Sequence, residues 1–186
     1  MRLSFVRRPF TAVAVGFCLV VADWQTPWLP SMLGWTLACL GLARVARRLP
    51  VFAPAAVAAL VAGLLLTRLY PLTLASGHLF PAYVTAQAVA ICATAGAILF
   101  HGWRTSDQTT KHVFSIVMNT LLIGEAAYLT GQVLIGRAAS ARSWDAVART
   151  FHNVAYPARA AQLAATVGFC VALLGCRKRL AHLGQR

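Results

Sequence analysis

Acidic residues are the scarcest feature of this chain. Only 4 of its 186 residues are Asp or Glu, and Glu125 is the single glutamate. Charged residues of both signs make up 11% of the chain, against about 25% in a typical soluble domain. A metal-dependent or two-carboxylate active site therefore has very few candidate members, and we assign no metal site.

Recognisable catalytic motifs are also missing. The chain contains no GxSxG, HExxH, P-loop or dinucleotide-binding GxGxxG pattern. The five cysteines form no CxxC pair, and four of them lie inside apolar runs, where they are interpreted as small buried hydrophobes. We assign no catalytic residue and regard an enzyme acting on a soluble substrate as the less favoured class.

Long apolar runs dominate the chain. Hydrophobic residues account for 59% of it, which indicates an integral membrane protein because a membrane-spanning helix needs about 20 mostly apolar residues. We predict an all-α bundle of six transmembrane helices with short loops, forming one domain over residues 1–186, with five spans as the alternative. The predicted spans are 10–23, 29–44, 51–70, 79–100, 113–135 and 156–175.

The first of these runs also has the character of a secretory signal. Arg2, Arg7 and Arg8 precede an apolar core that ends at Ala22. A second apolar run follows after only a few residues, so we prefer a helical hairpin. Whether the first span is a retained signal anchor stays open.

The net charge of +13 is distributed unevenly between the predicted loops. In a six-span chain, twelve Lys/Arg residues fall on the side of the termini and five on the other side. The positive-inside rule then places both termini in the cytoplasm, most simply at a bacterial inner membrane, with an organelle membrane as the alternative. Orientation accounts for these charges better than nucleic-acid binding, which we do not expect.

The C-terminal tail carries Arg177, Lys178 and Arg179 directly after the last span. Basic residues at this position are attracted to anionic lipid headgroups by about 1 kcal/mol each. We expect contacts with anionic lipids here, although a simple topology signal explains the same residues.

The longest predicted outer loop, 136–155, contains a second amphipathic pattern. Ser143 is placed to cap a short helix, and Trp144, Val147 and Phe151 share one apolar face. We predict a helix over 143–152 lying on the membrane surface, with an ordinary ordered loop as the alternative.

Small residues recur at helical spacing in four of the predicted spans. Such stripes let helix backbones approach closely, which drives association where lipid is as apolar as the side chains. They predict a tightly packed bundle. The stripes are Ala12/Gly16, Ala55/Ala59/Gly63, Ala86/Ala90/Ala93/Ala97 and Ala160/Ala164/Gly168/Ala172.

Glu125 is the most informative position, because it lies near the middle of the fifth span. An ionisable side chain at that depth should face the protein interior. Tyr128 and Gln132 follow on the same helical face, while Gly124 and Gly131 on an adjacent face allow a neighbouring helix to approach. The three polar residues predict a proton, cation or substrate site, or alternatively a structural hydrogen-bond cluster.

Two arginines are candidate counter-charges for Glu125. Arg68 and Arg159 both lie nearer the outer ends of their predicted helices. We therefore expect their side chains to extend to the membrane interface rather than to reach Glu125.

A haem hypothesis rests on two histidines on the predicted outer side, His78 and His152. A b-type haem needs axial ligands on opposite faces of its ring. Both histidines lie at a span end or in a loop, so the pattern for haem b is weak.

Three functional interpretations follow. The first is a non-catalytic subunit or accessory protein of a larger membrane complex, since soluble domains and catalytic groups are lacking. The second is a small transporter or channel in which Glu125, Tyr128 and Gln132 bind a proton, cation or substrate. The third is a haem- or quinone-linked electron-transfer subunit.

Overall fold

The computed structural model describes residues 4–22, 28–47, 49–75, 80–105, 108–140 and 143–183, and for 4–8, 28–30, 74, 101–105 and 176–183 the backbone alone. All elements within these ranges are helical, which confirms the predicted all-α class. They are α1 (Ser4–Val21), α2 (Trp28–Ala46), the 3₁₀ turn η1 (Pro50–Phe52), α3 (Ala53–Ala75), α4 (Phe80–Thr105), α5 (Gln108–Ser140), α6 (Trp144–Thr150), the π-helical turn η3 (Phe151–Ala155) and α7 (Tyr156–Leu183).

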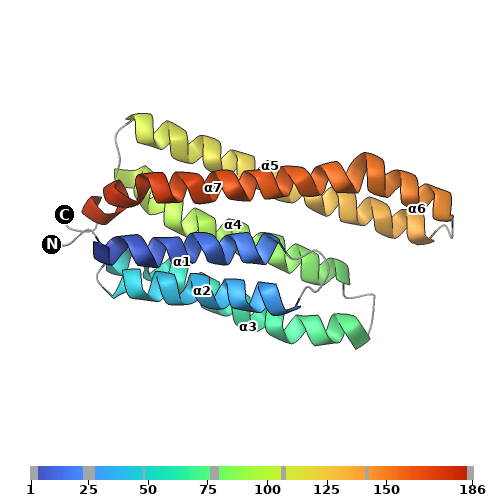
Figure 1. The fold of residues 1–186 in the computed structure, drawn as a ribbon, viewed down its shortest axis with the longest axis horizontal. Helices are drawn as coiled ribbons and strands as arrows, with labels where there is room; N and C mark the ends of the chain where they lie inside the picture. The colour runs from blue at the N-terminus through green and yellow to red at the C-terminus, as the bar shows by residue number, and fades with distance from the viewer. Residues whose placement is uncertain are drawn as a thin grey trace.

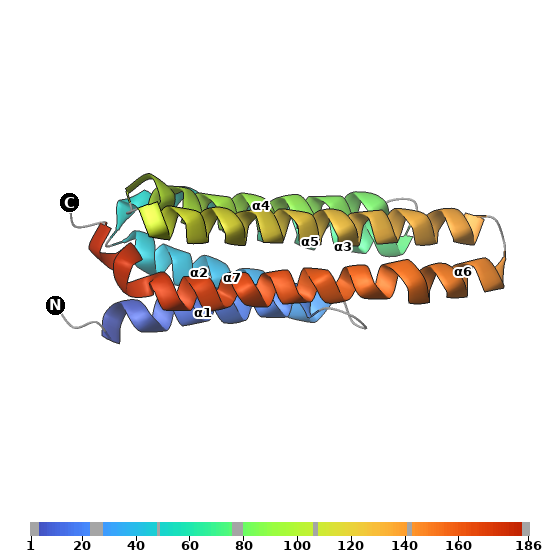
Figure 2. The same ribbon diagram turned by 90° about the horizontal axis from the view of Figure 1, so that it is seen from above.

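The long helices form an antiparallel bundle in two layers. One layer holds α2, α1 and α7, and the other holds α3, α4 and α5 (Figures 1 and 2). Each long helix packs against the next one along the chain, and α1 against α7 closes the ring. Because direction alternates, the start of α1 and the end of α7 lie at the same end of the bundle (Figure 1).

Four segments are long and apolar enough to cross a membrane: Pro50–Thr73, Phe80–Phe100, Gln108–Ser140 and Trp144–Gly175. The apolar parts of the first two helices are shorter, at Pro9–Val21 and Ser31–Ala46. This pattern supports an integral membrane protein. Its outward side chains fit the same class, because large apolar residues such as Leu64, Ile116 and Ile123 are exposed on the bundle surface.

Helices α1 and α2 pack with their backbones in close contact, and glycine residues permit this approach. A Cβ atom added at Gly16 would lie 2.5 Å from the carbonyl oxygen of Gly34 and 2.8 Å from the nitrogen of Ala38. Backbone meets backbone here, so no side chain can move aside. The predicted Ala12/Gly16 stripe is thus a packing face, as is the buried pair Ala55 and Ala59 on α3.

The stripe predicted on the last helix has a different outcome. Ala160, Ala164 and Gly168 are exposed, and nothing lies within 4 Å of a Cβ added at Gly168. The packing face of α7 instead carries Ala158 and Ala165, together with larger side chains such as Gln162 and Phe169. In an Ala-rich helix the small residues occur on both faces, so spacing alone selected the wrong one.

A helix is present where the sequence predicts one over 143–152, but it is not a separate element, and its position on a membrane surface stays a prediction. The Ser143 hydroxyl does cap α6, accepting a hydrogen bond from the N–H of Ala146 at 3.3 Å. However, α6 continues through η3 into α7 and packs along α5, so it is the first part of one long rod. Pro157 explains the π turn, since it has no N–H to continue the α-helical pattern and its ring crowds the preceding turn. The N–H of Tyr156 bonds to Phe151 instead.

This rod and α5 form a hairpin that extends beyond the ends of α1 to α4 (Figures 1 and 2). The 33 residues of α5 span about 50 Å, whereas a bilayer's hydrocarbon core is about 30 Å thick. Trp144 at the start of α6 is 86% exposed. Helix α5 and the rod therefore pack against each other over a greater length than the helices α1 to α4 span.

The glycine contact between α1 and α2 yields a prediction. Gly16→Ala should lower stability by about 1–3 kcal/mol, because the added methyl collides with backbone atoms and forces the helices apart. The measurement is thermal unfolding in mild detergent. Gly168→Ala is the matched control and should leave stability unchanged or slightly higher. Equal unfolding temperatures for the Gly16 variant and the wild type would contradict the packing described.

Candidate functional site

Glu125 lies in the interior of the bundle, as its position in the fifth span predicts. Its side chain is 3% exposed, and its Oε2 accepts a hydrogen bond from Nε2 of Gln162 on α7 at 2.8 Å. The neighbouring Gly124 makes this possible, since a Cβ there would lie 2.9 Å from the Cβ of Ala165. Helices α5 and α7 thus approach closely at the level of the carboxylate.

Gln162 links Glu125 to a buried arginine. The guanidinium of Arg159, one turn earlier on α7, donates to Oε1 of Gln162 and to the backbone oxygen of Val21. It also lies over the ring of Tyr128, with 4.7 Å between the guanidinium carbon and the ring centre. Arg159 is only 8% exposed, so the expectation that it extends to the membrane interface is wrong.

The partner of Arg159 on α1 explains why an arginine is held here. Helix α1 ends at Val21, and the last carbonyls of a helix have no partner within it. Arg159 satisfies the carbonyl of Val21, while Nε2 of Gln87 on α4 donates to that of Val20 at 3.0 Å. A cation at a helix C-terminus is also favoured by the helix dipole.

The charges of Arg159 and Glu125 offset one another through Gln162. Leaving either one alone in an apolar interior would be strongly unfavourable, so each supports the other. Arg68, the other predicted counter-charge, is exposed on α3 and has no place in this cluster. We call Glu125, Gln162 and Arg159 the buried relay.

One carboxylate oxygen of the relay lacks a hydrogen-bond partner among the described residues. Oε1 of Glu125 is buried and has no hydrogen-bond partner in the described part of the chain. Buried polar atoms are nearly always paired, so an unpaired carboxylate oxygen indicates a function or an unseen partner. A proton is the smallest group that such an oxygen can take up.

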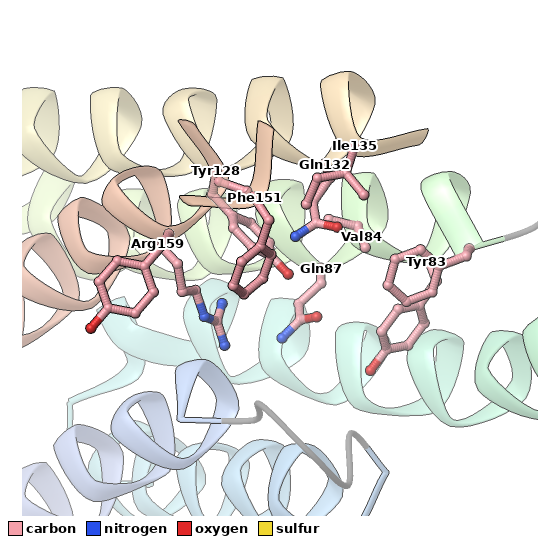
Figure 3. Close-up of a pocket in the computed structure, with 11 residues that line it drawn as sticks. Tyr83, Val84, Gln87, Tyr128, Gln132, Ile135, Phe151 and Arg159 are labelled. Atoms are coloured by element: carbon pink, nitrogen blue, oxygen red, sulfur yellow. The ribbon is translucent and has the colours of Figure 1, made fainter. Parts of the chain in front are cut away.

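A pocket of about 340 Å³ adjoins the relay between α4, α5 and the η3–α7 segment (Figure 3). Arg159 is part of its wall, together with Tyr128 and Gln132 of the predicted polar stripe. Glu125 does not line it and lies behind Arg159 and Gln162. The full lining is Phe80, Tyr83, Val84, Gln87, Tyr128, Gln132, Ile135, Phe151, Ala155, Tyr156 and Arg159.

The pocket is polar at one end and apolar at the other. Gln87, Tyr128 and Arg159 lie at the deep end, close to the terminus of α1. Phe80 and Phe151 lie one to two turns further out along their helices and are partly exposed, at 43% and 36%. The π turn contributes directly, because Phe151 and Ala155 both belong to it.

The structure therefore brings together Tyr128 and Gln132 at the pocket and connects Glu125 to it through α7. Sequence reasoning missed Gln87 and Gln162 and misjudged Arg159. A usable signal existed for both glutamines, since a long polar side chain inside an apolar run needs a hydrogen-bond partner.

Other predicted site residues stand apart from this pocket. His152 is exposed on η3, next to the pocket residue Phe151. His78 lies outside the described residues, as do the side chains of Arg177, Lys178 and Arg179. The haem and anionic-lipid hypotheses thus stay predictions. Among the residues described, no group of three or more His, Cys, Asp or Glu is placed to hold a metal ion.

Comparison with protein-family models, with curated proteins and with solved structures finds no match to this chain. Functional inference therefore rests on the relay and the pocket.

The buried relay makes a prediction about stability. Arg159→Met should destabilise the protein by about 3–5 kcal/mol, because it leaves Glu125 as an uncompensated buried charge. Adding Glu125→Gln should recover part of that loss, so the two changes are coupled by about 1 kcal/mol or more. Denaturation in mild detergent measures all four members of the cycle.

The control for this cycle is Arg68→Met, which removes an exposed arginine. It should change stability by less than about 0.5 kcal/mol. Strictly additive losses for the Arg159 and Glu125 variants would show that the two charges do not depend on one another.

Proposed function

We propose that this protein is a small membrane transporter in which Glu125 takes up and releases a proton while a substrate occupies the pocket between α4, α5 and α7. The observation that carries the proposal is the buried relay, which joins an intramembrane carboxylate to Arg159 in the pocket wall. Tyr128 and Gln132 serve as substrate-binding residues.

Energetics supports a functional carboxylate. An ionisable group at this depth is unfavourable by a few kcal/mol at least, and such groups commonly mark ion pathways or proton relays. Taking up a proton at the unpartnered Oε1 would neutralise Glu125 and leave the charge of Arg159 unbalanced. Because Arg159 lines the pocket, the protonation of Glu125 and the occupant of the pocket would influence each other.

The proposed topology has six spans, with both termini in the cytoplasm and a bacterial inner membrane as the location. The antiparallel order of the long helices, which brings the start of α1 and the end of α7 to the same end of the bundle, supports it (Figure 1). Helices α1 and α2 complete the count, the shorter apolar part of each being sheltered by its packing against the other.

Reporter fusions test this topology in a bacterial host. Green fluorescent protein fused after residue 186 should fluoresce, and alkaline phosphatase fused there should be inactive, since the first works in the cytoplasm and the second only outside it. A phosphatase fusion after Ser140 is the internal control and should be active. An active phosphatase at residue 186 would contradict six spans with a cytoplasmic C-terminus.

Proton uptake by Glu125 is tested on proteoliposomes adsorbed to a solid-supported membrane. A rapid pH step should give a transient charge displacement from proton binding, even without substrate. Glu125→Gln should abolish this current, because the amide keeps the bond from Gln162 but cannot titrate. Glu125→Asp should retain a reduced current, which separates loss of the acid from loss of the fold.

Asp145→Asn is the matched control, since Asp145 is an exposed carboxylate on α6. Its current should equal that of the wild type. Equal currents from the Glu125→Gln variant and the wild type would contradict the proposal. A wild-type signal no larger than that of empty liposomes would also contradict it and would favour the complex-subunit interpretation.

A further inference from the structure

The chemistry of the pocket selects a class of ligand. We infer that it binds a small uncharged amphiphile with a ring-containing apolar body and one carbonyl or hydroxyl group, held by the side chain of Gln132. This inference rests on the proposed function, since it names the substrate class of the same pocket.

The charge of the ligand follows from the charge of the walls. Arg159 is the only lining residue whose side chain is of a charged type, and its charge is offset by Glu125 through Gln162. The guanidinium is already engaged with Gln162, the carbonyl of Val21 and the ring of Tyr128. While Glu125 is ionised, an anion or a cation in the pocket would add an unbalanced charge in an apolar environment, whereas a neutral molecule adds none.

The polar contact falls to Gln132. Its carboxamide lines the pocket and makes no hydrogen bond among the residues described, whereas the amide nitrogen of Gln87 is used by the carbonyl of Val20. A carboxamide offers both donors and an acceptor, so it matches either a carbonyl or a hydroxyl. Figure 3 shows the Gln132 amide directed toward the space between α4 and α5.

The body of the ligand is set by the other walls. Five of the lining residues are aromatic, and rings pair favourably with rings in offset or edge-on arrangements. The volume of about 340 Å³ is near the lower limit of ligand pockets, about 300–1,000 Å³, so the ligand is small. Partly exposed Phe80 and Phe151 at the outer end suit an apolar molecule that arrives from the membrane.

Photolabelling of the full-length protein in liposomes tests this inference. Benzophenone is the probe, because it is a neutral diaryl ketone that attaches to nearby C–H bonds on illumination, and mass spectrometry of peptides maps the site. Labelling should concentrate on the three walls of the pocket, which are residues 80–87 of α4, 128–135 of α5 and 151–159 of η3 and α7. Labelling spread evenly over the lipid-facing helix surfaces would overturn the inference.

Three competitors of the same shape define the chemistry. Fluorenone, a neutral ketone, should suppress the labelling, while fluorene, which lacks the oxygen, should compete at least about fivefold more weakly. Fluorenone-4-carboxylate should also compete weakly because of its charge. Equal competition by fluorene would exclude polar recognition, and stronger competition by the carboxylate would assign an anionic ligand instead.

Variants at Gln132 complete the test. Gln132→Leu should reduce pocket labelling about fivefold, and Gln132→Asn, which keeps a carboxamide, should restore most of it. Thr130→Val is the control, because Thr130 is exposed on the same helix and should not affect labelling. Unchanged labelling in the Gln132→Leu variant would overturn the role of that residue.

The outcome is separable from that of the proton measurement. If Glu125 carries no proton current but ketone-selective labelling persists, the pocket is a binding site without proton-coupled transport. If the current is present and the labelling is unselective, the transporter stands and the ligand class is wrong.

Discussion

The C-terminus of α1 is the constraint on which the polar interior depends. This helix ends at the buried residue Val21, and its last carbonyl oxygens, which lack partners within the helix, accept hydrogen bonds from neighbouring helices. Gln87 provides one donor from α4 and Arg159 provides another from α7. Using an arginine brings a full positive charge into an apolar region, and that charge in turn requires the carboxylate of Glu125, with Gln162 between them.

The pocket has the same origin. Gln87 and Arg159, which hold the end of α1, also form the deep wall of the pocket, so the pocket begins where α1 stops. The opposite wall depends on Pro157, whose missing N–H is accommodated by the π turn that contributes Phe151 and Ala155. The early end of α1 and Pro157 thus account for the polar deep end of the pocket and for part of its aromatic outer end.

Three residues of the candidate site were proposed from the sequence, whereas the residues that contact them on other helices were missed. Glu125 was identifiable because a rare polar residue in an apolar helix is expected to point into the protein. Helical periodicity then places Tyr128 and Gln132 on the same side of the helix. Gln162 and Arg159 were not identifiable as their partners, since that pairing depends on the register between α5 and α7. The same limit explains the surface helix: periodicity gave α6 its apolar face and Ser143 its capping role, but could not reveal that the helix continues through a π turn.

Packing alone does not require the charges of the relay. A neutral amide is sufficient to satisfy the carbonyl of Val20, as Gln87 demonstrates, so a second amide in place of Arg159 would meet the same need at Val21. Replacing a buried ion pair with well-packed apolar residues is often neutral or even stabilising. Stability alone therefore does not explain why these positions carry Arg159 and Glu125 rather than uncharged side chains. Under the proposed function, the charged pair adds a group that changes its protonation and, through Gln162, alters the electric field at the pocket wall. This is the property that a proton-coupled binding site needs and a purely structural contact does not.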